Sequence, residues 1–124
     1  TLAELFRLRG VSLDRREDGT LRVLLTWEAL VERPALDATV FVHALDANGA
    51  IVTQSDIRPW NGQYPTFIWG KGEIVQTEHI LTPGEARDLR LSAGMYTFPS
   101  LMRLPVVQDG AAVDGGFVDL GRLR

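Results

Sequence analysis

The chain has 124 residues, of which 45% are hydrophobic and 23% are charged, and its formal net charge is −3 at neutral pH. This balance is typical of one globular domain with its own core. It argues against nucleic-acid binding, which needs a clustered basic face. The absence of cysteine excludes disulfides, thiol catalysis and cysteine metal sites. No apolar run approaches the roughly 20 residues of a membrane helix, so direct membrane insertion is not expected.

The first part of the chain predicts a β-hairpin. Residues 5–13 and 21–28 read as strands joined by a charged turn, and Gly10 predicts a bulge in the first of them. The second strand alternates apolar and polar residues from Leu21 to Trp27, so one of its faces is expected in the core. Leu24 is the exception, because it is apolar on the face expected to meet water.

A second hairpin is predicted from residues 39–45 and 51–55, which flank an Asn48-Gly49 turn. The first of these strands is apolar on both faces, as in the centre of a covered sheet. Further strands are expected at residues 74–81, 93–96, 101–107 and 113–120, the last with Gly115-Gly116 as a candidate bulge. About seven to eight short strands separated by turn signals predict an all-β fold: a single antiparallel β-sandwich over residues 1–124, immunoglobulin-like or of jelly-roll type.

Several short motifs occur in an order that is similar to one bacterial domain type. They are Leu25-Thr26-Trp27, Phe41-Val42-His43-Ala44-Leu45-Asp46, Gln54-Ser55-Asp56, Tyr64-Pro65-Thr66, Trp69-x-x-Gly72-Glu73, Gly94-Met95-Tyr96 and Arg103-Leu104-Pro105-Val106. Together they span nearly the whole chain. The set resembles the soluble C-terminal β-sandwich domain of bacterial membrane glycosyltransferases of the protein-mannosyltransferase-like class, which is common in Chloroflexi.

The resemblance implies an extracytoplasmic domain at the outer face of the bacterial cell membrane, joined to the transmembrane part of a longer parent protein. The missing initiator methionine agrees with a piece of a longer chain. The resemblance implies no catalysis here, because the catalytic carboxylates of such transferases lie in their membrane part. We therefore expect a non-catalytic accessory domain that binds or positions a glycan or polysaccharide, or packs on its transferase.

The segment from residue 56 to 72 is the best functional lead, since irregular loops longer than about 12–15 residues are usually functional or disordered. Trp60 and Tyr64 could present flat faces to a sugar ring. Neighbouring polar side chains could bind its hydroxyl groups, namely Asp56, Asn61 and Gln63. The alternative is that the rings cover one end of the sandwich. Trp69 completes the candidate set, although Trp-x-x-Gly-Glu looks like a structural corner.

The histidines of the chain are His43 and His79. His43 lies in an apolar strand, which favours a buried structural histidine paired with Asp56 over a metal ligand or a catalytic base. The spacing fits no metal or cofactor motif, so no metal, cofactor or catalytic residue is predicted. The alternative functions are a small hydrolase or metal-dependent enzyme that uses His43, Asp56 and Glu73, and a purely structural interaction domain without a ligand.

Overall fold

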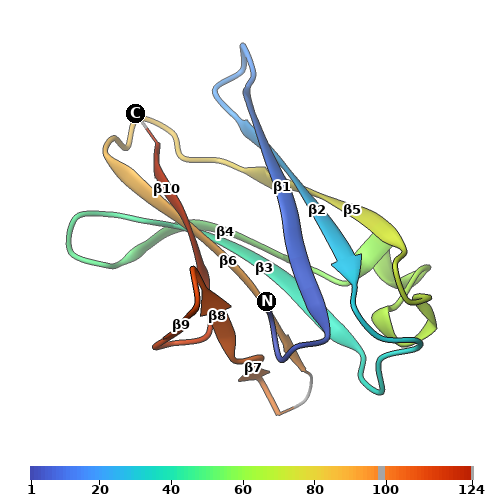
Figure 1. The fold of residues 1–124 in the computed structure, drawn as a ribbon. Helices are drawn as coiled ribbons and strands as arrows, with labels where there is room; N and C mark the ends of the chain where they lie inside the picture. The colour runs from blue at the N-terminus through green and yellow to red at the C-terminus, as the bar shows by residue number, and fades with distance from the viewer. Residues whose placement is uncertain (98–99, 124) are drawn as a thin grey trace.

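The computed structural model describes residues 1–97 and 100–123, in which the chain is all-β, as the sequence predicts (Figure 1). The longer strands are β1 (Phe6–Arg15), β2 (Leu21–Ala29), β3 (Ala38–Leu45), β4 (Ile51–Ile57), β5 (Ile74–Leu81), β6 (Leu89–Thr97) and β10 (Val118–Leu123). The shorter strands are β7 (Met102–Arg103), β8 (Val106–Gln108) and β9 (Ala111–Val113). Two 3-10 turns, η1 (Pro59–Gly62) and η2 (Thr66–Ile68), lie between β4 and β5. None of these described elements is a helix long and apolar enough to span a membrane.

The longer strands form two antiparallel sheets that face one another in a sandwich-like arrangement (Figure 1). The smaller sheet has the order β1-β2-β5, and the larger sheet has the order β10-β6-β3-β4 with β7 beside β6. β8 and β9 form a separate hairpin, which the N-terminal segment contacts through a bridge between Leu2 and Val106. Each sheet therefore combines strands from distant parts of the chain.

Alternate residues of each strand fill the core between the sheets. The alternation expected in β2 is confirmed, because Leu21, Val23, Leu25 and Trp27 are at most 1% exposed and the intervening side chains are half-buried. Burial of each such large apolar side chain stabilises the fold by about 1.5–3 kcal/mol. β3 is buried on both faces, as expected for a strand at the centre of a covered sheet.

A chain of buried hydrogen bonds joins the two sheets where β4 lies beside β5. His79 of β5 is fully buried, and its Nδ1 lies 3.2 Å from the hydroxyl of Ser55 in β4. The Nε2 of His79 lies 2.9 Å from the hydroxyl of Thr77, which also accepts a hydrogen bond from the indole N–H of Trp27 at 3.1 Å. His79 is therefore a core residue with both ring nitrogens satisfied.

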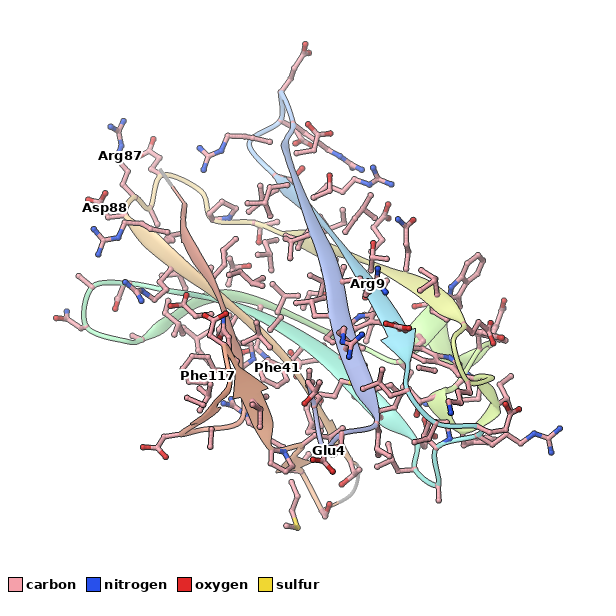
Figure 2. All side chains as sticks on the ribbon, viewed as in Figure 1. Glu4, Arg9, Phe41, Arg87, Asp88 and Phe117 are labelled. Carbon is pink, nitrogen blue, oxygen red and sulfur yellow. The ribbon has the colours of Figure 1, made fainter. Side chains whose placement is uncertain are left out.

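The outer face of the smaller sheet is polar along β1. Arg7 and Arg9 both donate to the carboxylate of Glu28 in β2, at 3.3 and 3.0 Å, and Figure 2 shows Arg9 reaching across this face. The register shifts between Leu8 and Gly10, which confirms the predicted bulge. Charged side chains and a bulge on this free edge disfavour pairing with the edge strand of another molecule.

Two strands predicted near the C-terminus are divided in the structure. Residues 101–107 form β7 and β8, because Leu104 turns into the core and Pro105 has no N–H to donate to a neighbouring strand. Residues 113–120 are interrupted at Gly115 and Gly116, which both have positive φ and form the turn between β9 and β10. The expectation of one strand over residues 101–107 was wrong, and the irregularity expected at Gly115-Gly116 is a turn between two strands rather than a bulge within one.

Gly94 provides a test of the packing on the larger sheet. It lies in β6 opposite Phe41, and a Cβ atom there would lie 2.6 Å from Phe41 Cζ and 2.9 Å from the carbonyl oxygen of Gly116. We expect Gly94→Ala to lower the free energy of unfolding by about 1–3 kcal/mol, because backbone as well as a ring must move. Urea denaturation measures the change. Gly10→Ala is the control, since its Cβ would meet only Thr26 at 3.8 Å, and equal losses in the two variants would contradict the steric explanation.

Candidate functional site

The connection between β4 and β5, residues 58–73, is packed against the sandwich. Thr66 is fully buried, and its hydroxyl accepts the N–H of Ala38 at 3.0 Å and donates to a backbone carbonyl at 2.7 Å. At the start of the connection, Arg58 donates two hydrogen bonds to Asp37, at 2.6 and 3.2 Å. These contacts fix the backbone, so the side chains that the loop presents to solvent have defined positions.

Trp69 anchors this loop in the core. Its side chain is fully buried, its indole N–H donates to the carbonyl of Tyr64 at 3.0 Å, and its ring meets the ring of Phe6 edge-on with 5.4 Å between centroids. Directly after it, the N–H of Gly70 donates to the carboxylate of Glu73 at 2.9 Å and closes a tight corner. A buried ring cannot contact a ligand, so Trp69 is removed from the candidate binding residues.

Trp60 has the opposite environment, because its side chain is 62% exposed. Its φ is 54°, and Asn61 also has a φ of 54°, so two successive non-glycine residues adopt the left-handed conformation. Such a conformation costs roughly 1–2 kcal/mol per residue. The turn is held by hydrogen bonds from the N–H of Asn61 to the carbonyl of Arg58 at 2.9 Å and from the N–H of Gln63 to the carbonyl of Trp60 at 3.0 Å. A strained turn thus displays a large ring to solvent, which is typical of functional positions.

The indole of Trp60 lies between two hollows along β5, which is the edge strand of the smaller sheet opposite to β1. The first has a volume of about 390 Å³ and is lined by Arg22, Leu24, Ile57, Trp60, Asn61, Gln76, Thr77 and Glu78. The second has a volume of about 280 Å³ and is lined by Trp60, Tyr64, Glu73, Ile74, Val75 and Gln76. We call the two hollows together the Trp60 groove. Trp60 and Gln76 line both hollows. A ligand that lies across the indole of Trp60 therefore contacts the two hollows at once.

Polar side chains surround the apolar surface of the Trp60 groove. The guanidinium of Arg22 donates to the carboxylate of Glu78 at 2.5 Å, and the amide of Gln76 donates to the hydroxyl of Thr26 at 3.3 Å. Within the described part of the chain, the side-chain amide of Asn61 and the side-chain oxygen Oε1 of Gln76 have no hydrogen-bond partner. These groups are available to a polar ligand.

Tyr64 lines the Trp60 groove, but its hydroxyl is already engaged. Its ring stacks on Trp69 with 6.5 Å between centroids, and its hydroxyl donates to the carboxylate of Glu73. The hydrogen bond to Glu73 raises the pKa of Tyr64, while the N–H of Gly70 and then the Tyr64 hydroxyl lower the pKa of Glu73. Glu73 is therefore a fixed carboxylate at the wall of the groove. Gln63 is exposed and lines neither hollow.

The structure separates Asp56 from Trp60. β4 extends to Ile57, so Asp56 lies within the strand opposite Phe41 and not in the loop. Successive side chains of a strand point to opposite faces. Ile57 consequently lines the Trp60 groove, whereas Asp56 lines a hollow on the outer face of the larger sheet. The sequence-based grouping of Asp56 with Trp60 is corrected accordingly.

His43 lies beside Asp56 on that outer face, with 3.8 Å between His43 Nε2 and Asp56 Oδ1. This distance is too long for a hydrogen bond. Glu73 is not with them, because it lines the Trp60 groove and binds Tyr64. The three residues of the hydrolase hypothesis are therefore not brought together. Among residues 1–97 and 100–123, no cluster of three or more histidines and carboxylates could hold a metal ion.

Sequence reasoning missed the strand residues that form the floor of the Trp60 groove. They occupy outward-facing positions of β2 and β5, chiefly Leu24, Ile74 and Gln76. Leu24 carried the available signal, because it was the one apolar residue on the face of its strand expected to meet water. In the structure Leu24 is half-buried in the hollow beside Trp60.

Comparison of the chain with protein-family models finds no match, and comparison with curated proteins finds no similar sequence.

Proposed function

We propose that this protein is a non-catalytic binding domain that holds a glycan in the Trp60 groove. The observation that carries the proposal is the exposed indole of Trp60, fixed on a strained turn between two hollows with polar rims. A sugar ring has an apolar C–H face and a rim of hydroxyl groups. An aromatic face bordered by amides and a carboxylate matches both properties.

The groups around the indole support specific roles. The C–H face of a sugar packs on Trp60, and its hydroxyl groups donate to the carboxylate of Glu73 and the carbonyl oxygen of Gln76. The amide of Asn61 donates to a hydroxyl or ring oxygen. Glu73 is ionised and held by Tyr64 and the backbone, so it is a preorganised acceptor. Preorganised groups lose little entropy on binding, which favours affinity.

The cellular context that we propose is the outer face of the bacterial cell membrane. The domain would be an accessory part of a membrane glycosyltransferase-like protein, with the transmembrane part of that protein as its partner. The ordered motifs, among them the Trp69-x-x-Gly72-Glu73 corner, support this context. A binding domain beside such a transferase would keep a glycan substrate near the catalytic part.

We also infer an immunoglobulin-like rather than a jelly-roll type of sandwich. If the strands β1, β2, β3, β4, β5, β6 and β10 are named A, B, C, C′, E, F and G, the two sheets have the orders A-B-E and G-F-C-C′. Immunoglobulin-like sandwiches place A, B and E in one sheet and C, F and G in the other. The strand order therefore supports the immunoglobulin-like type.

A glycan array followed by titration of the best ligand tests the binding function. We expect Trp60→Ala to weaken binding at least about 30-fold, since a central tryptophan contributes about 2 kcal/mol or more. Phe67→Ala is the matched control, because Phe67 is an exposed ring of the same loop that lines neither hollow, and we expect it to bind as the wild type does.

Tryptophan fluorescence gives an independent measurement of the same interaction. Trp27 and Trp69 are fully buried, so Trp60 is the indole that a ligand can contact directly. Quenching that disappears in Trp60→Phe supports the proposal. If the wild type binds no glycan, the binding function is rejected and a structural role is favoured. If Trp60→Ala binds as tightly as the wild type, the Trp60 groove is rejected as the glycan site.

A further inference from the structure

A second groove lies on the outer face of the larger sheet, away from the Trp60 groove. Its first hollow has a volume of about 290 Å³ and is lined by Phe41, His43, Gln54, Asp56, Tyr96, Leu101 and Arg103. A neighbouring hollow of about 370 Å³ shares Asp56 and Tyr96 with it. Phe41, labelled in Figure 2, belongs to β3 and lines the first hollow. We call the two hollows the outer-face groove. Most of its side chains come from β3, β4 and β6, so it is built on strands rather than on loops.

His43 is a buried polar side chain without a hydrogen-bond partner in the described structure, at the floor of the outer-face groove. The residue is 8% exposed, and in the described structure its ring makes no hydrogen bond, since the nearest carboxylate oxygen, of Asp56, is 3.8 Å away. No buried side-chain nitrogen or oxygen of the described residues is left both unpaired and sealed from solvent, so the His43 nitrogens open to the groove. Burial lowers the pKa of His43, so its neutral ring has one donor and one acceptor to offer.

Arg103 provides a positioned cation at the wall of this groove. Its guanidinium lies over the ring of Phe41, with 4.5 Å between the guanidinium carbon and the ring centroid, and one nitrogen donates to the carbonyl of Gly115 at 3.0 Å. In residues 1–97 and 100–123 it has no carboxylate partner within salt-bridge distance. By contrast, Arg58 at the far end of the outer-face groove is already paired with Asp37. Arg103 is therefore the cation available to an anionic ligand.

Asp56 provides the opposite charge at a fixed position. Its carboxylate accepts hydrogen bonds from the hydroxyl of Tyr96 at 3.0 Å and from the amide of Gln54 at 3.2 Å. The half-buried ring of Tyr96 forms an aromatic floor next to it, and the buried ring of Phe41 supports Tyr96 from 6.2 Å away between centroids. One groove thus combines an aromatic floor, an oriented carboxylate, a neutral imidazole and an unpaired guanidinium.

We propose that the outer-face groove binds a sugar residue that carries a carboxylate, such as a hexuronic acid in an acidic glycan. The guanidinium of Arg103 forms two parallel hydrogen bonds with the sugar carboxylate, because the two groups are planar and match in geometry. The C–H face of the sugar packs on the half-buried ring of Tyr96. Its hydroxyl groups bind the ring of His43 and the carboxylate of Asp56.

The charges of the groove select this class of ligand over its alternatives. A neutral sugar would leave the guanidinium of Arg103 without an anionic partner. A phosphate group without a polyol ring would lie near the carboxylate of Asp56 and gain nothing from the aromatic floor. A uronic acid satisfies the cation at one end and the acceptors at the other. This site does not depend on the Trp60 groove, so it would make the domain a binder with two separate sites.

Two-dimensional amide NMR titration of the protein tests this inference directly. The probes are glucuronate, galacturonate, glucose, acetate and inorganic phosphate. We expect saturable shifts for at least one of the two uronates, confined to β3, β4, β6 and residues 101–103. Glucose and acetate are each expected to bind at least 10-fold more weakly, because each lacks one of the two required parts. Phosphate binding as tight as that of the uronate would show a simple anion site and overturn the proposal.

Variants connect the binding to the two central residues. Arg103→Gln is expected to weaken uronate binding at least 10-fold, and Arg103→Lys to restore only part of it, because lysine keeps the charge without the planar geometry. His43→Gln is expected to weaken uronate and glucose alike. Arg90→Gln is the control, since Arg90 lies on the same sheet but is paired with Asp119 at 3.0 Å.

The amide spectrum of each variant verifies folding, and the location of the shifts distinguishes the two sites. Absence of shifts at saturating uronate concentrations, or unchanged binding by folded Arg103→Gln, overturns the outer-face site and leaves the Trp60 proposal intact. Shifts that map to the Trp60 groove and disappear in Trp60→Ala overturn the outer-face site while supporting the first proposal.

Discussion

Replacing Trp69 with alanine is expected to lower the free energy of unfolding by about 3–5 kcal/mol, as for other buried tryptophans. The ring is fully buried, packs edge-on against Phe6 and stacks with Tyr64, and its N–H satisfies the carbonyl of Tyr64. The substitution therefore leaves a cavity and an unpaired backbone carbonyl at once. A loss of this size is a large part of the roughly 5–15 kcal/mol that stabilises a typical domain.

Trp60→Ala is the matched control for this experiment, because it removes the same side chain from the same loop at an exposed position. We expect it to change the free energy of unfolding by less than about 0.5 kcal/mol. Chemical denaturation followed by circular dichroism gives both values without depending on tryptophan fluorescence. Similar losses in the two variants would show that the loop contributes to stability as a whole, contrary to the division of roles between a buried anchor and a displayed ring.

Acidification is expected to destabilise the fold through His79. Burial lowers the pKa of His79 to about 4 in the folded protein, with partial compensation from the charges of Asp56 and Glu78, whereas its unfolded value is 6.5. Between these values the unfolded chain binds a proton that the folded protein does not bind. The contribution of His79 is therefore fully present above pH 6.5 and is lost as the pH falls towards 4, by about 3 kcal/mol in total.

Urea denaturation at several pH values between 7 and 4.5 measures this dependence. His79→Gln is expected to be less stable at pH 7 and to lose most of the pH dependence, with the remainder due to His43, whose pKa is also lowered by burial. His43→Gln is expected to keep most of the slope, because His79 is fully buried and its pKa is lowered to about 4, whereas the His43 nitrogens open to the outer-face groove. Glu73 contributes to the pH dependence only at more acidic pH. Its pKa is lowered from 4.5, so its stabilising effect is lost as the pH falls below that value. A flat wild-type profile between pH 6.5 and 4.5 would contradict the role of His79.

The sequence predicted those parts of the fold in which local pattern and tertiary environment agree. The alternation of β2 is visible from Leu21 to Trp27, and each apolar position of that pattern is buried. The structural corner after Trp69 was also recognisable from its glycine and glutamate. In β2 the alternation by itself indicates which side chains are buried, whereas at the corner the sequence indicated the turn but left Trp69 among the candidate ligand-binding residues.

The candidate site was only partly predictable, because its composition depends on the exact end of β4. A strand that ends at Ser55 leaves Asp56 in the loop with Trp60, whereas a strand that continues to Ile57 sends Asp56 to the opposite face. A shift of two residues in one boundary therefore moves a charged group from one groove to another. The partnership of Trp60 with Leu24 joins two segments that are remote in sequence, and no local pattern encodes it.

The interleaved order of the strands has a consequence for how the molecule unfolds. β2 and β3 follow each other in the chain but belong to different sheets, and each is completed by a strand that comes much later, β5 for the first and β6 for the second. Neither half of the described chain contains a whole sheet, so no fragment that ends between β4 and β5 retains a closed core. Loss of structure in one sheet removes the partner surface of the other, and the two sheets are expected to melt as one cooperative unit.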